Sequence, residues 1–95
     1  MQINLTGHQM EITSALKSFT EEKFSKLTHH FDNITAINVV FNIEKLAQIA
    51  EATIHVAKGT FHARAEHDDM YVAVNDLVEK LDQQLIKHKE KLRTH

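Results

Sequence analysis

Residues 34–67, ITAINVVFNIEKLAQIAEATIHVAKGTFHARAEH, alternate apolar and polar side chains along most of their length. A period of two residues is typical of β-strands that bury one face and expose the other. We therefore expect three strands in a sheet that is covered on one side only. The side chains expected to face inward are Ile37, Val39, Phe41, Ile43, Ala50, Ala52, Ile54, Val56, Phe61, Ala63 and Ala65.

Two further signals delimit these strands. Lys58-Gly59 lies between the second and third of them, and it predicts a two-residue hairpin because glycine tolerates positive φ. Upstream, the sequence QINLTG at residues 2–7 also alternates. It predicts a short first strand that ends at Gly7.

The apolar period lengthens to that of a helix in two other segments. The first predicted helix covers about residues 13–30, with Thr13 as its N-cap. Its apolar side consists of Leu16, Phe19, Phe24, Leu27 and Phe31. The second begins at Asp68-Asp69, whose charges suit a helix N-terminus, and runs for about 24 residues. Its apolar stripe consists of Met70, Val74, Leu77, Leu81, Leu85 and Leu92.

The expected fold is an α+β two-layer sandwich with the element order β-α-β-β-β-α. A helix that connects the first two strands makes a right-handed crossover, so these strands should be parallel neighbours. Both helices must cover the apolar face of the four-stranded mixed sheet. We expect a single domain over residues 1–95, resembling a double-stranded-RNA-binding fold with an added first strand.

The composition excludes several classes of function. The chain has no cysteine, which excludes disulfides and thiolate chemistry. It has neither a signal-peptide pattern at its start nor an apolar run that could span a membrane, so we expect a cytoplasmic protein. Asp68 and Asp69 are adjacent and poorly placed as an opposed acid and base. We therefore expect neither enzymatic activity nor a cofactor.

Positive charge gathers at the C-terminal end of a chain whose formal charge is −2. Lys80, Lys87 and Lys91 fall on one stripe of the predicted helix, and Lys89 and Arg93 fall on a second. Lys23 and Lys26 lie on the first helix, which should be alongside. Two interpretations remain open: a positive ridge that contacts phosphates, or a solvated helix end that complements the helix dipole.

Histidine is unusually frequent, with eight residues. His55 and His62 should lie on the open face of adjacent strands, where a pair of imidazoles can bind Zn²⁺. No third ligand is apparent at a suitable spacing, so we expect exposed structural histidines and no metal. A metal-binding protein is the alternative.

The single tyrosine, Tyr71, should lie at the edge of the core, packing on strand 59–67 or stacking on a base.

Several segments together resemble the short form of the ribosome hibernation-promoting factor family, in the ribosome-associated inhibitor / sigma-54 modulation protein superfamily. These segments are LTGHQMEITSALKSF at the start, FDNI at 31–34, EATIHVAKGTFHARAEHDDMY in the middle and KLDQQLIKHKEKL near the end. The resemblance implies the same β-α-β-β-β-α fold. The end of the chain at His95 favours the short form, because it leaves no room for a second, dimerising domain.

The resemblance also implies a function. Family members bind the small ribosomal subunit between head and body in stationary phase and occupy the channel for messenger and transfer RNA. Short-form members act with ribosome modulation factor to pair ribosomes into inactive dimers. The implied partners are the small subunit with its rRNA and this factor, with no membrane and a monomeric free protein. The RNA-binding residues would be Lys23, Lys26, Lys80, Lys87, Lys89, Lys91 and Arg93, with Arg64 on the open sheet face a weaker candidate.

Two other functions remain open at this stage. A ribosome-associated inhibitor would block translation at the same site without promoting dimers. A generic double-stranded-RNA-binding module would contact phosphates in much the same way, because A-form RNA is recognised largely by its shape.

Overall fold

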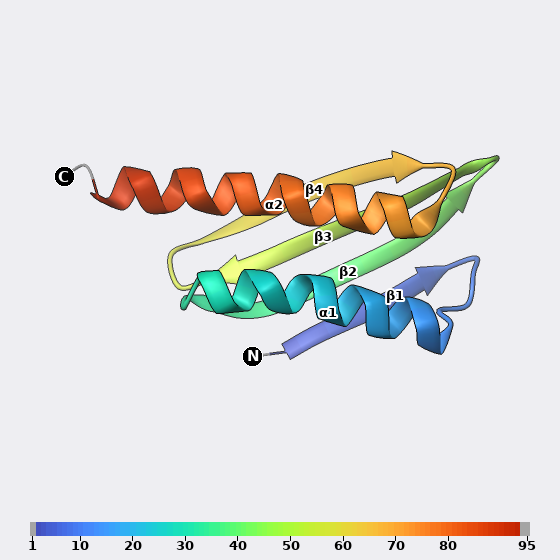
Figure 1. Cartoon of the computed structure of the whole chain (residues 1–95), viewed down its shortest axis with the longest axis horizontal. Helices are drawn as coiled ribbons and strands as arrows, with labels where there is room; N and C mark the ends of the chain where they lie inside the picture. Colours follow the sequence, from blue (N-terminus) through green and yellow to red (C-terminus); the bar gives the residue numbers. More distant parts are fainter. Residues whose placement is uncertain (1, 94–95) are drawn as a thin grey trace.

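The computed structural model describes residues 2–93, and side chains up to Lys91. It has the predicted element order, β-α-β-β-β-α (Figure 1). The elements are β1 (Gln2–His8), α1 (Ser14–His30), β2 (Ile34–Glu44), β3 (Ala47–Val56), β4 (Gly59–His67) and α2 (Met70–Arg93). None of the helices in this part of the chain combines the length and the apolarity needed to cross a membrane.

The four strands form one mixed sheet in the order β1-β2-β3-β4. β1 is parallel to β2, with Leu5 opposite Val39, so the predicted parallel pairing is confirmed. The other two pairings are antiparallel, with Val39 opposite Ala52 and Ala52 opposite Ala63. Both helices lie on one face of the sheet and run in the same direction (Figure 1). The predicted two-layer sandwich is therefore confirmed.

The core lies between the helices and the covered face of the sheet. Its largest side chains are fully buried and include Phe24 from α1, Phe41 from β2 and Leu81 from α2. Burial of side chains of this size contributes about 1.5–3 kcal/mol each, which makes this layer the main source of stability. Ile43, predicted to face inward, is 37% exposed because it lies near the end of β2, beyond the cover of the helices.

Side chains cap both helices at their N-termini. The Thr13 hydroxyl accepts a hydrogen bond from the Leu16 amide at 3.1 Å, as the sequence predicts. At α2, the Asp69 carboxylate accepts from the Tyr71 amide at 2.9 Å. Each bond satisfies an amide that has no partner within its helix.

Two details of the predicted turns are wrong. β1 does not end at Gly7, which pairs with Phe41 inside the strand. The hairpin between β3 and β4 is present, but its loop is Ala57-Lys58, and Gly59 pairs with Val56 without positive φ. Positive φ occurs instead at Gln9, after β1, and at Lys45, in the β2–β3 hairpin.

Helix α2 protects the free edge of β4. The Lys80 ammonium donates a hydrogen bond to the Arg64 carbonyl at 2.8 Å, and the Gln84 amide donates to the His62 carbonyl at 3.1 Å. Unpaired carbonyls on an edge strand can recruit another strand, and covering them opposes such pairing. Lys80 therefore has a structural contact in addition to its predicted role.

Candidate nucleic-acid interface

The lysines of α2 lie on two different flanks of the helix. Lys80 faces β4, where it bonds to the Arg64 carbonyl. Lys87 and Lys91 follow Lys80 by about two and three helical turns, so they share its flank, and both are exposed. We call Lys80, Lys87 and Lys91 the outer flank.

Lys89 lies on the opposite flank, which faces α1. It lines a cleft together with His30 and Phe31 from the end of α1. The same three residues also line an adjoining hollow, whose other lining residues include Asp82 and Glu90. On α1 itself, the Lys23 ammonium lies 5.4 Å from the centre of the Phe19 ring, and Lys26 is exposed. We call Lys23, Lys26 and Lys89 the inner group.

The cations therefore form two groups rather than one continuous ridge. Residues 87 and 89 point about 200° apart around a helix, so a single flat RNA surface could not contact both. Arg64 lies on the open sheet face, as predicted, and its guanidinium is 3.4 Å from the Glu66 carboxylate. The backbone of Arg93 belongs to α2, but its side chain and that of Leu92 lie outside the described residues.

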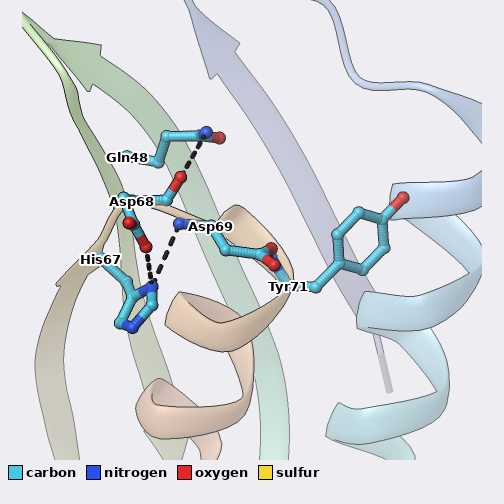
Figure 2. Close-up of polar contacts among 5 residues, drawn as sticks. All are labelled: Gln48, His67, Asp68, Asp69 and Tyr71. Carbon is cyan, nitrogen blue, oxygen red and sulfur yellow. Dashed lines mark hydrogen bonds and ion pairs between the residues drawn. The ribbon is translucent and has the colours of Figure 1, made fainter.

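A small network fixes the start of α2 relative to the sheet (Figure 2). The Gln48 amide donates to the Asp68 carbonyl at 3.1 Å, which joins β3 to the β4–α2 connection. His67 Nδ1 lies 3.1 Å from the Asp69 amide and 2.7 Å from an Asp68 carboxylate oxygen. This nitrogen can accept from the Asp69 amide only where it carries no proton, and it can donate to Asp68 only where it carries one. The network sets the direction in which α2 leaves the sheet, and hence where its lysines lie.

Tyr71 joins the two helices near their N-terminal ends. Its ring points toward α1 (Figure 2) and meets Phe19 edge to face, with 4.9 Å between ring centres. The sequence-based alternatives were packing on β4 or stacking on a base. The structure places the ring against α1, so packing on β4 is wrong, and stacking on a base stays a prediction. Because Tyr71 is 40% exposed, it buries only part of its surface in this contact.

We expect Tyr71→Ala to destabilise the protein by about 1–2 kcal/mol, because the edge-to-face contact and the half-buried ring are lost. Thermal melting measures this directly, and a domain of this size should lose roughly 4–8 °C per kcal/mol. Tyr71→Phe keeps the ring and should melt close to the original chain. A Tyr71→Ala protein with unchanged melting but lost RNA binding would instead assign the ring to base stacking.

The open face of the sheet is polar. Asn4 on β1 donates to Asn38 on β2 at 3.0 Å, and His62 Nε2 lies 3.3 Å from the Glu51 carboxylate. Among the described side chains, no three histidines or carboxylates come close enough together to hold a metal ion. The cations on and between the helices are therefore the stronger candidates for a binding surface.

Comparison with known proteins identifies the family. Residues 3–93 match the family model described as sigma 54 modulation protein / S30EA ribosomal protein. The chain belongs to this family. The resemblance inferred from the sequence segments is thus confirmed.

Two relatives of this S30EA family chain carry the same name. A ribosome hibernation promoting factor from Azotobacter vinelandii is 54% identical over 91 residues, covering 96% of this chain and 85% of the relative. The protein of the same name from Escherichia coli (strain K12) is 48% identical over 95 residues, and the match covers both chains completely.

Solved structures of related proteins share the fold. A ribosomal subunit interface protein from Coxiella burnetii is 38% identical, with a TM-score of 0.86 over 95% of this chain and 99% of that chain. The N-terminal domain of Thermus thermophilus Protein Y is 27% identical, with a TM-score of 0.86 over 93% of this chain and 99% of that chain. The two-layer sandwich is thus a fold that this chain shares with related proteins.

Proposed function

We propose that this S30EA family protein binds the small ribosomal subunit through its rRNA, in the channel used by messenger and transfer RNA. Binding there silences translation reversibly in stationary phase, and with ribosome modulation factor it promotes inactive ribosome dimers. The protein acts by occupying the site rather than by catalysis, as a cytoplasmic monomer whose single domain makes the contact.

The observation that carries this proposal is the full-length correspondence with proteins named ribosome hibernation promoting factor. The geometry supports it through the two cationic groups on the helical layer. Lysines that contact RNA phosphates release condensed counterions, which provides affinity without reading the base sequence. Two groups on opposite flanks of α2 suit a site with RNA on more than one side, such as a channel.

We expect the purified protein to sediment with small subunits in a sucrose gradient, and not with isolated large subunits. The same gradient with added duplex RNA tests the alternative of a generic double-stranded-RNA-binding module. Migration with the duplex and not with small subunits would reject the proposal. A second gradient, with whole ribosomes, ribosome modulation factor and this protein, distinguishes a hibernation-promoting factor from a ribosome-associated inhibitor. A peak of ribosome dimers supports the first, and suppression of that peak by the protein supports the second.

A further inference from the structure

A cleft lies between the end of α1, the β3–β4 hairpin and the C-terminal half of α2. These three segments lie at one end of the molecule, where α2 continues past the other two (Figure 1). Its volume is about 330 Å³, at the lower end of the range for sites that bind small molecules. Residues from three segments far apart in the sequence form its walls: 30–33, 56–58 and 85–89.

The walls of the cleft are largely apolar. Phe31, the C-cap residue of α1, supplies an aromatic ring that is only partly buried. Val56 and Ala57 approach from the hairpin, and Leu85 approaches from α2. His88 completes the wall, and its ring is held edge to face against Phe61 with 5.0 Å between ring centres. The cleft thus has largely apolar walls that include two rings, and the His88 ring is held in position by its contact with Phe61.

The polar groups that line the cleft favour an anion. Lys58 and Lys89 are its cationic lining residues, and His88 contributes an imidazole. His30 also lines the cleft, but its Nδ1 lies 4.0 Å from the carboxylate of Asp82, which lines the adjoining hollow. No aspartate or glutamate is among the lining residues, although the whole chain has 13 acidic residues against 11 lysines and arginines. The positive bias is therefore a local property of this cleft and not of the protein as a whole.

We infer that this cleft holds one unstacked nucleotide of ribosomal RNA. The base would lie against Phe31, Val56 and Leu85, and Lys58 and Lys89 would contact the adjacent phosphates. Proteins recognise unpaired RNA bases by stacking them on aromatic side chains while cationic groups follow the backbone. This inference rests on the proposed function, and it gives the inward-facing Lys89 a role distinct from that of the outer flank.

The decisive experiment narrows the cleft without changing any charge. Ala57 is exposed at the hairpin, so Ala57→Leu places a larger side chain at the cleft wall at little risk to folding. We expect small-subunit binding to weaken roughly tenfold, in line with the loss of one stacked base. The salt dependence should not change, because no phosphate contact is removed. Thr60→Leu, exposed on the same hairpin but outside the cleft, should bind like the original chain.

If Ala57→Leu binds small subunits as tightly as the unmodified chain does, the cleft assignment is overturned and the proposed function stays intact. Failure of the unmodified chain to bind small subunits would overturn both.

A crosslinking experiment distinguishes RNA from protein as the occupant. Because the chain has no cysteine, Ala57→Cys carries a unique attachment point for a short photoreactive group.

We expect the group at Cys-substituted position 57 to crosslink to one or two rRNA nucleotides. The same group on Lys45→Cys, in the hairpin at the opposite end of the sheet, should not label them (Figure 1). Crosslinks from position 57 to a ribosomal protein, or to no partner, would overturn the assignment.

Discussion

The double substitution Lys87→Gln and Lys91→Gln should flatten the salt dependence of small-subunit binding by roughly 1.4–1.8 in log–log slope. Each lysine that neutralises a phosphate releases counterions, and each lost contact changes the slope by roughly 0.7–0.9. Both residues lie on the outer flank and are exposed. Their loss near the C-terminal end of α2 should cost only about a few tenths of a kcal/mol each in stability.

A matched control is available elsewhere on the chain. Lys17 on α1 and Lys45 in the β2–β3 hairpin are also exposed, and neither belongs to the outer flank, the inner group or the cleft. Their double substitution by glutamine removes the same net charge and should leave the slope unchanged. Equal slopes for the two double variants would mean that the basic end of α2 is only a solvated helix terminus.

The single variant Lys89→Gln tests the inner group separately. If Lys89 contacts the phosphate of a nucleotide in the cleft, its loss should flatten the slope by roughly 0.7–0.9. A slope equal to that of the original chain would mean that Lys89 itself makes no phosphate contact.

Gly7→Ala should destabilise the protein clearly, although it adds only one methyl group. A Cβ atom at this position would lie 2.6 Å from the Met10 carbonyl oxygen and 3.3 Å from Ile12 Cγ1. The nearer atom belongs to the backbone, so the β1–α1 connection itself must move. Overpacking of this kind typically costs about 1–3 kcal/mol. Urea or thermal unfolding measures the loss.

The other glycine of the chain provides the control. A Cβ atom at Gly59 would meet only Val56 Cγ2, at an ordinary 3.9 Å, and the backbone there has no positive φ. Gly59→Ala should therefore be neutral, or stabilise by about 0.4–1 kcal/mol through the unfolded chain. A larger loss at Gly59 than at Gly7 would contradict this account of the β1–α1 connection.

Periodicity was sufficient to predict the fold. Alternation in residues 34–67 and the helical stripe ending at Leu85 specify which faces are buried, and burial determines how the layers stack. Turn details depend on local backbone geometry that residue type signals only weakly. Gly7 looked like a strand terminator, but the structure requires glycine there because the chain passes close to it after the strand.

The candidate site was less predictable than the fold. Helical spacing alone separates Lys87 from Lys89, but it does not say that one flank meets β4 and the other meets α1. The bond from Lys80 to the Arg64 carbonyl depends on where α2 lies relative to the free edge of the sheet. The cleft combines residues more than 50 positions apart, such as His30 and Leu85, and no local pattern marks it.

Competition with transfer RNA is the most direct test of the central claim. Initiator transfer RNA is bound to small subunits on filters while the protein is added to saturation, with occupancy confirmed by sedimentation. If the protein fills the channel, retained transfer RNA should fall toward background as occupancy approaches one protein per subunit. Undiminished transfer RNA binding on fully occupied subunits would show that the protein binds elsewhere.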